Sequence, residues 1–203
     1  FKKMKKTTYL LSILLLTLIS CGERTSFTLK GNISGLKSDT LLVYYQLPKY
    51  KLDTIITDKG KFDYTISPDT FTIFSLVFDS QNTYPIYADK GEKVELNGTI
   101  DNFIVKGKGE NQALANILTT IADVPSHSIK QKVDSIIKNN AYSFTNIYLI
   151  DKYYAQDSLP DITKIKELIT GMGGIIRETP YMMNLLAKIE HLAEKDKNRS
   201  IYS

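Results

Sequence analysis

The chain has 203 residues, with 26 basic and 22 acidic side chains, one cysteine and no tryptophan. Its length is enough for one large domain or two small ones. The basic excess lies entirely in Lys2, Lys3, Lys5 and Lys6, so the rest of the chain is balanced and offers no clustered positive field for nucleic acid.

The N-terminus has the layout of a secretory signal, because the basic head is followed by an apolar run over residues 9–19. A transmembrane helix needs roughly 20 apolar residues, and this run is interrupted at Ser20 and ends at Gly22. The stretch "LISC", residues 18–21, resembles the bacterial lipobox, in which cleavage precedes the cysteine. We therefore predict a lipoprotein signal peptide over residues 1–20.

Cys21 is the lipidation site that this resemblance implies, with fatty acids such as palmitate on its sulfur and on the new amino group. Each buried methylene contributes about 0.8 kcal/mol, so several acyl chains hold a protein firmly to a membrane. No aspartate directly follows Cys21 and no acidic run does. We therefore expect a lipid anchor in the cell envelope, at the periplasmic face of the outer membrane.

Residues 21–108 are predicted to form an all-β domain, because short runs rich in β-branched and aromatic residues alternate with turn signals. The predicted strands are 26–33, 40–47, 52–57, 61–66, 71–78, 84–88, 93–98 and 102–107. Eight strands at this spacing favour an antiparallel sandwich or a partly open barrel. Gly60 predicts a tight hairpin and Gly91 a second turn. The candidate bulky core residues are Phe27, Phe62, Phe71, Phe74 and Phe78.

Residues 109–195 have a helical period and predict a small antiparallel helical domain of four or five helices. The apolar stripes are Leu114, Ile117, Leu118 and Ile121; Ile129, Val133, Ile136 and Ile137; and Met182, Leu185, Leu186 and Ile189. Thr179 and Pro180 are a capping residue and a first-turn proline. Residues 196–203 lack an apolar stripe and predict a linker or a disordered end. The fold class is therefore α+β.

The order of these segments resembles the family called domain of unknown function 4369. The most specific part is "KGEKVELNG" at 90–98 followed by "VKGKGENQAL" at 105–114, which couples the last hairpin to the first helix. This resemblance implies the N-terminal module of thioredoxin-like bacterial lipoproteins. Such relatives usually continue into a domain with a Cys-x-x-Cys site, whose thiolate attacks a disulfide. No residue pair of this chain matches that motif, so no catalytic residue is carried over and no enzyme activity is expected.

Other site chemistry finds little support in the sequence. His127 and His191 lack partners at the spacing of zinc ligands, and both are interpreted as surface residues. The Gly-x-Ser-x-Gly motif that presents a nucleophilic serine does not occur. Gly107-Lys108-Gly109 lacks the remainder of a phosphate loop and is interpreted as a strand-to-helix connection. Asp157 and Asp161 are interpreted as turn and capping residues. We predict neither a cofactor nor a metal site.

Two surface features remain as hypotheses. Tyr44, Tyr45, Tyr84 and Tyr87 could form a platform for a carbohydrate or a peptide, although alternation along a strand places about half of such residues in the core. Thr54, Thr40, Ser135 and Ser158 follow an aspartate and precede an aliphatic residue, which resembles an O-glycosylation motif of the Gram-negative, often gut-dwelling bacteria in which the resembled lipoproteins occur. Chance matches to so short a motif are common.

Three functional interpretations follow. The favoured one is a lipid-anchored, non-catalytic N-terminal module of a thioredoxin-like thiol:disulfide oxidoreductase, truncated or split from its catalytic domain. The alternative is a free-standing binding lipoprotein for a peptide, a glycan or a partner protein, which would use the exposed sheet or its edge. A hydrolase is the third and has the least support. The expected partners are the membrane, through Cys21, and an envelope protein or a thioredoxin-like domain.

Overall fold

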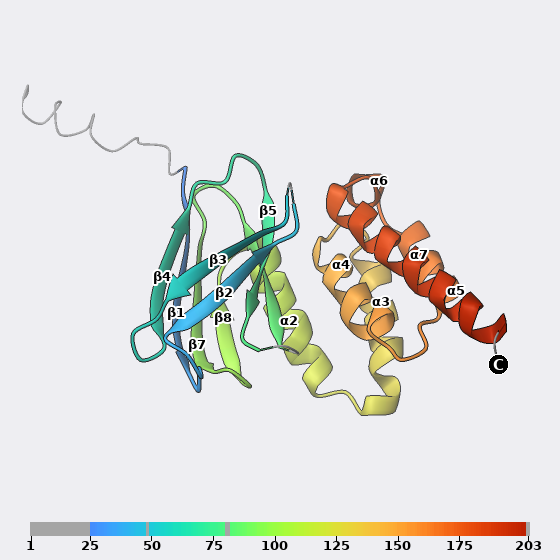
Figure 1. The fold of residues 1–203 in the computed structure, drawn as a ribbon, viewed down its shortest axis with the longest axis horizontal. Helices are drawn as coiled ribbons and strands as arrows, with labels where there is room; N and C mark the ends of the chain where they lie inside the picture. The colour runs from blue at the N-terminus through green and yellow to red at the C-terminus, as the bar shows by residue number, and fades with distance from the viewer. Residues whose placement is uncertain (1–24, 48, 80–81, 202–203) are drawn as a thin grey trace, which may run out of the picture.

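The structure is a computed structural model that describes residues 25–47, 49–79 and 82–201, with side chains described up to residue 194. A β-sandwich is followed by a layer of helices, and one long helix runs along the sandwich and joins the two parts (Figure 1). The α+β class predicted from the sequence is confirmed. The β part consists of two separate four-stranded sheets, so the sandwich is correct and the barrel is not.

Sheet 1 has the strand order β4-β1-β7-β8. Its strands are β1 (Phe27–Ser34), β4 (Lys61–Ile66), β7 (Lys93–Thr99) and β8 (Phe103–Lys106). The β1–β4 and β7–β8 pairs are antiparallel, but β1 and β7 are parallel, with Leu29 opposite Val94. Parallel neighbours need a long crossover connection, and here that crossover includes the whole of sheet 2.

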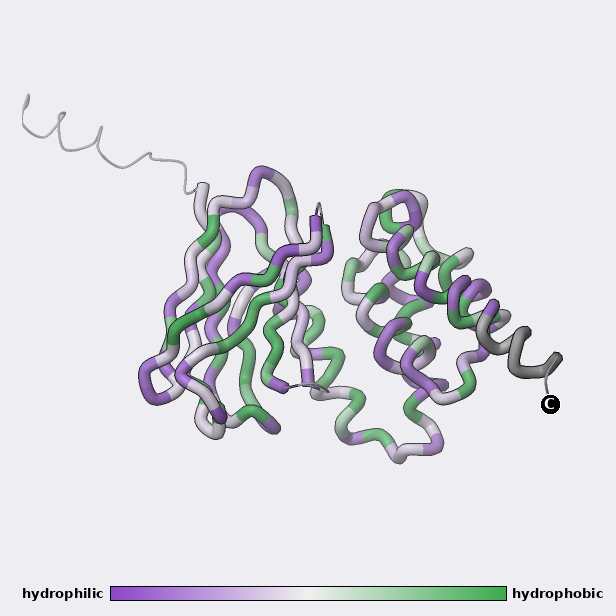
Figure 2. Tube along the Cα trace, in the orientation of Figure 1, coloured by the Kyte–Doolittle hydropathy of each residue, from purple (hydrophilic) through white to green (hydrophobic). Residues whose placement is uncertain are grey.

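Sheet 2 has the order β3-β2-β5-β6, and all of its pairs are antiparallel. Its strands are β2 (Thr40–Tyr45), β3 (Lys51–Ile56), β5 (Thr72–Val77) and β6 (Thr83–Ala88). All eight strands predicted from the periodicity are present in the described residues. Hydrophobic and hydrophilic residues alternate along the strands, as expected when one face of each sheet is buried (Figure 2).

The sandwich core forms from the inward-facing positions of both sheets. Phe27 and Phe74 are fully buried and meet edge to face, with ring centroids 6.1 Å apart. Phe62 is also buried, whereas Phe71 and Phe78 are partly exposed and pack against the core from its rim. Three of the five predicted core phenylalanines are therefore buried, and the other two lie at its edge.

The tight turn predicted from Gly60 connects β3 of sheet 2 to β4 of sheet 1. It is closed by an isolated bridge between Asp58 and Lys61, but β3 and β4 do not pair as the strands of a hairpin. Lys59 and Gly60 have φ angles of 50° and 84°, the left-handed pair that a two-residue turn needs to match strand twist. A Cβ on Gly60 would lie 2.1 Å from the backbone oxygen of Ile33. Only glycine fits this position without displacing β1. Gly91, with φ 76°, supplies the second predicted turn.

The helical part has more helices than the sequence predicts. The described residues contain α2 (Gly109–Ala122), α3 (Ile129–Asn139), α4 (Thr145–Ile150), α5 (Ile162–Thr170), α6 (Gly174–Arg177) and α7 (Pro180–Ile201), with a 3₁₀ turn at Ser126–Ser128 and a π-helical turn at Asp151–Ala155. The short α6 begins at Gly174, at the end of the glycine-rich stretch 171–174, where the sequence predicts no helix. Thr179 caps α7 as predicted, accepting a hydrogen bond from the N–H of Met182 at 3.2 Å.

Helix α7 continues to Ile201, so residues 196–201 are helical where a linker or a disordered end is predicted. Lys197 and Arg199 have good intrinsic helix propensity, whereas Asp196, Asn198 and Ser200 do not, so propensity alone does not account for this end of the helix. Among the described side chains of α7, the last one buried in the helical core is Ile189, so the helix extends beyond its apolar stripe.

Helix α2 belongs to two hydrophobic cores. Its Leu114 is buried with the sandwich residues, whereas its Ile121 is buried with residues of α3, α4, α5 and α7. Figure 1 shows α2 running along the sandwich before the chain turns into the helical layer. The two parts of the fold are thus held together by one helix whose ends are packed in different cores.

Candidate functional site

The junction between β8 and α2 fixes where the helices stand against the sheets. Asn111 is fully buried and bonds to the backbone of Tyr87 twice: its Oδ1 accepts from the Tyr87 N–H at 3.0 Å, and its Nδ2 donates to the Tyr87 carbonyl at 2.6 Å. These are the two bonds that a further strand would make with β6. Asn111 therefore closes the edge of sheet 2 with a side chain.

The neighbouring residue ties α2 to α4. The Glu110 carboxylate accepts from the Ser143 hydroxyl at 2.6 Å and from the Thr145 N–H at 3.2 Å. Thr145 is the first residue of α4, and a negative charge is favourable at a helix N-terminus. The Gly107–Gly109 segment is the strand-to-helix connection predicted from the sequence, and Gly109 has φ 50°.

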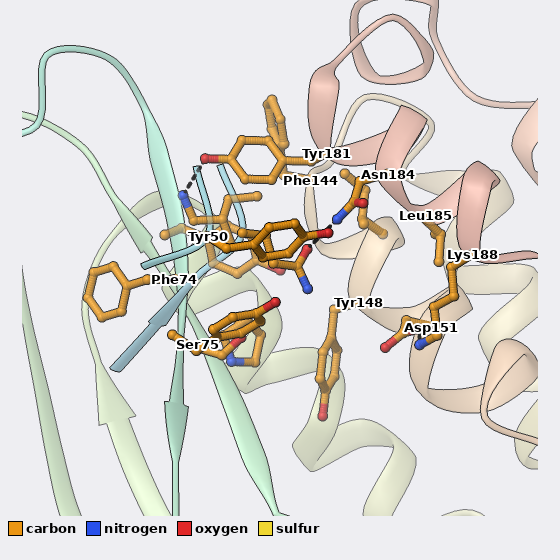
Figure 3. A pocket seen from close by; sticks show the side chains of 16 residues that line it. Tyr50, Phe74, Ser75, Phe144, Tyr148, Asp151, Tyr181, Asn184, Leu185 and Lys188 are labelled. Atoms are coloured by element: carbon orange, nitrogen blue, oxygen red, sulfur yellow. Dashed lines mark hydrogen bonds and ion pairs between the residues drawn. The ribbon is translucent and has the colours of Figure 1, made fainter. Parts of the chain in front are cut away.

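A cleft of about 310 Å³ lies between the outer face of sheet 2 and helices α4 and α7 (Figure 3). Five tyrosines line it, together with two phenylalanines and several polar side chains. The tyrosines are Tyr44, Tyr50, Tyr87, Tyr148 and Tyr181. Pockets that bind small ligands are concave, mostly apolar and start at about 300 Å³, so this cleft has the size and the lining of a binding site.

Strand alternation supplies the sheet side of the cleft. Tyr45 and Phe74 are buried in the sandwich core, which turns Tyr44 and Ser75 to the outer face, where they are paired in register. Tyr50 follows β2 and stacks on Tyr44, with ring centroids 6.1 Å apart and ring planes 17° from parallel. These two rings form an aromatic wall on the sheet side.

Helix α7 provides the opposite wall through residues spaced along one face. Tyr181, Asn184 and Lys188 all line the cleft. The N–H of Ile73 donates to the Tyr181 hydroxyl at 2.9 Å, because the β2–β5 ladder ends at the next residue, Phe74, and does not reach Ile73. The Asn184 Nδ2 donates to the Gln46 Oε1 at 3.0 Å. Both bonds cross the cleft and hold α7 against the sheet (Figure 3).

An ion pair lies at the helix side of the cleft. Lys188 of α7 pairs with Asp151 (Figure 3). Asp151 also accepts from the Gln156 Nε2 at 3.0 Å. Asp151 begins the π-helical turn that follows α4. Such turns are rare and occur frequently at functional sites. The local widening of the helix thus coincides with the charged end of the cleft.

The phenols of Tyr87, Tyr148 and Tyr181 stay protonated at neutral pH. Burial raises the pKa of Tyr148 to about 12, with Tyr153 and Asp151 adding to the effect. Burial also raises the pKa of Tyr87 and, less strongly, that of Tyr181. These hydroxyls can therefore donate as well as accept hydrogen bonds. The described lining contains no histidine and no cysteine.

The predicted aromatic platform is half correct. Tyr44 and Tyr87 line the cleft, but Tyr45 faces the other way, and its hydroxyl is 2.7 Å from that of Tyr64. Tyr84 lies in the core beside a second depression along α2, and its buried hydroxyl has no hydrogen-bond partner within the described part of the chain.

Sequence reasoning missed the residues that come from the helices and from the loop after β2. These are Tyr50, Tyr148, Asp151, Tyr181, Asn184 and Lys188. The available signal was the polar and aromatic stripe at 181, 184 and 188, which lies beside the apolar stripe of α7. Helical spacing places such residues on one face, but it does not say what that face meets.

The remaining candidates lie away from the cleft. His127 and His191 are exposed, as predicted, and the described residues contain no cluster of metal-ligating side chains. Asp161 caps α5 by accepting from the Lys164 N–H at 2.9 Å, and Asp157 pairs with Lys130. The hydroxyl residues Thr40, Thr54, Ser135 and Ser158 are all exposed. Cys21 and the predicted signal peptide lie outside the described residues.

Comparison with protein families identifies the sandwich. Residues 27–114 match the sequence model of the family described as Domain of unknown function (DUF4369). This stretch is a DUF4369 domain. It begins with β1 and ends at Leu114, the α2 residue that is buried in the sandwich core. The resemblance drawn from the sequence is confirmed.

The DUF4369 domain supplies only one wall of the cleft. Asn111 belongs to it, as do the cleft residues of sheet 2, whereas Tyr148, Tyr181 and Lys188 come from the helices that follow. The searches of curated proteins and of solved structures found no match. Within the part of the chain that the structure describes, none of the helices has both the length and the apolar character needed to cross a membrane.

Proposed function

We propose that this protein is a lipid-anchored, non-catalytic module of the bacterial cell envelope, and that it acts by binding a small ligand in the cleft between sheet 2 and helix α7. The observation that carries the binding function is the cleft itself. Five tyrosines, an amide pair and an ion pair converge there from both parts of the fold. Sites of this composition bind ligands by burying them against aromatic surface and orienting them with a few polar groups.

The anchor in this proposal rests on Cys21 and the lipobox-like residues before it. Acylation there would hold the module at the periplasmic face of the outer membrane. The resemblance to the N-terminal module of thioredoxin-like lipoproteins supports a role in presenting a ligand or partner to such a domain. The chain has a single cysteine, and we expect no turnover in an insulin-reduction assay; clear reductase activity would overturn the non-catalytic part.

The binding function is tested by thermal denaturation of the full chain with a library of neutral sugars, short peptides and nucleosides. A ligand at about a hundred times its dissociation constant stabilises a protein by about 2.7 kcal/mol, which raises the midpoint of a chain of this size by about 5–10 °C.

Each stabilising compound is then tested on two variants. Tyr50→Ala removes half of the aromatic wall, and we expect it to abolish the shift. Tyr142→Ala is the matched control, because Tyr142 is 72% exposed, like Tyr50 at 70%, but lies outside the cleft. Equal shifts in both variants would contradict binding in the cleft.

A further inference from the structure

The charges of the cleft indicate an uncharged ligand. Asp151 and Lys188 are the charged residues of the described lining, and they are paired with each other. The side chain of Asp151 is 31% exposed and that of Lys188 is 48% exposed. An anionic or cationic ligand would find no unpaired opposite charge in the described lining and would have to compete with this pair, whereas an uncharged ligand can bond to both members of the pair without separating them.

The backbone that lines the cleft offers no free strand edge, because the outer strand β3 contributes no residue to the described lining. A peptide that binds as an added strand needs an unpaired strand edge. Strand β2 lies between β3 and β5, and β5 lies between β2 and β6. The N–H of Ile73, where the β2–β5 ladder ends, is taken by Tyr181, and the edge of β6 at Tyr87 is taken by Asn111. A ligand here is therefore held by side chains.

The side chains combine flat aromatic faces with polar groups at their rims. Tyr44 and Tyr50 are stacked and form one wall. The amides of Gln46 and Asn184 cross the cleft. A sugar ring has an apolar C–H face and a rim of hydroxyls that both donate and accept. The tyrosine faces match the first property, and the tyrosine hydroxyls, the amides and the ion pair match the second.

From these three properties we infer that the cleft binds an uncharged glycan, with a sugar ring packed against Tyr50 and its hydroxyls bonded to the Gln46–Asn184 amides and the Asp151–Lys188 pair. This inference rests on the proposed binding function and names the ligand class for the same cleft. The volume of about 310 Å³ is at the small end for ligand pockets. The site accordingly takes the end of a short glycan.

The test is isothermal titration calorimetry of the full chain in detergent with five probes. Three are neutral trisaccharides, namely maltotriose, cellotriose and triacetylchitotriose. The fourth is the anionic trigalacturonate, and the fifth is triserine with an acetylated N-terminus and an amidated C-terminus, which is an uncharged peptide. We expect at least one neutral trisaccharide to bind and trigalacturonate to bind at least tenfold more weakly. Tyr50→Ala should weaken the neutral sugar by at least about tenfold, as truncation of a central aromatic contact does, and Tyr142→Ala should not.

The outcomes separate the two proposals. If triserine binds in a Tyr50-dependent way and no sugar does, the glycan inference is overturned and the binding function stands. Tighter binding of trigalacturonate than of every neutral sugar also overturns the inference, because the charge argument then fails. If no probe binds, and no compound of the thermal library depends on Tyr50, the binding function falls together with the inference.

Discussion

Replacing Asn111 by alanine tests whether a side chain closes the edge of sheet 2. The wild-type amide makes two bonds with the Tyr87 backbone, at 3.0 and 2.6 Å, in a fully buried position. Alanine would leave a buried N–H and a buried carbonyl without partners, at a cost of about 1–3 kcal/mol each. We therefore expect the free energy of unfolding to fall by about 2–6 kcal/mol, a large part of the 5–15 kcal/mol typical of a folded protein.

The assay is urea denaturation followed by circular dichroism, with Asn116→Ala as the matched control. Asn116 lies on the same helix but is exposed, so the same chemical change there should cost less than about 0.5 kcal/mol. A loss below about 1 kcal/mol for Asn111→Ala, with an unchanged denaturant slope, would refute the reasoning. It would mean that the edge of β6 is satisfied without this amide.

Asn111→Asp provides a second check because it can reproduce both bonds only when it is protonated. Burial should raise the pKa of the new carboxyl above the usual value of about 3.9. A group whose pKa is higher in the folded state stabilises the fold below its unfolded pKa and loses that contribution as pH rises through its folded pKa. This variant should therefore become less stable between acidic and neutral pH, relative to the wild type over the same range.

Four further predictions follow from single sites. Gly60→Ala should lower the free energy of unfolding by more than about 2 kcal/mol, since φ is 84° and the new Cβ would meet the Ile33 oxygen. Gly174→Ala is the control and should change the urea midpoint little, because the nearest atom to a Cβ there is 3.7 Å away. Similar losses for both variants would contradict the steric argument. Tyr181→Phe should cost about 1 kcal/mol and speed hydrogen exchange at the Ile73 amide, whereas unchanged exchange would mean that the 2.9 Å bond does not protect it. Cys21→Ala should abolish labelling by radioactive palmitate and release the protein from membranes while leaving its circular dichroism unchanged, and persistent labelling would disprove the anchor. Intact-mass measurement of the protein from its native host tests O-glycosylation at Thr40, Thr54, Ser135 and Ser158, a hypothesis that a mass equal to polypeptide plus lipid would remove.

Local features of the fold were predictable because they depend on residues close together in the chain. The alternation along β2 and β5 follows from the two-residue period of a strand, and the turn at Gly60 follows from its backbone freedom. The parallel pairing of β1 with β7 could not be derived this way, since it joins segments more than 60 residues apart and depends on how the two sheets stack.

The cleft was harder to predict for the same reason. Tyr44 is visible in the sequence as part of an aromatic run, but Tyr148 and Tyr181, on the opposite wall, lie more than a hundred residues later on helices. Helical spacing placed the buried residues of α7 correctly, because burial repeats every three to four residues. It did not predict which polar face would meet the sheet. That arrangement is set by Asn111 and Glu110, two polar residues that look like ordinary first-turn residues of α2.

The sharing of α2 between two cores has a consequence for how such chains can be joined to other segments. The family match ends at Leu114, in the middle of this helix. The direction of the segments that follow the DUF4369 domain is therefore set by the number of residues in α2 and by the rotation that each of them adds. Inserting one residue between Leu114 and Ile121 would rotate all later helices by about 100° and shift them by about 1.5 Å. Tyr148 and Tyr181 would then face away from sheet 2. Inserting a whole helical turn would restore the rotation but would move these helices by about 5.4 Å along α2, far enough to break the Tyr181–Ile73 and Asn184–Gln46 hydrogen bonds. The length and the helical phase of α2 therefore set the geometry of the cleft together.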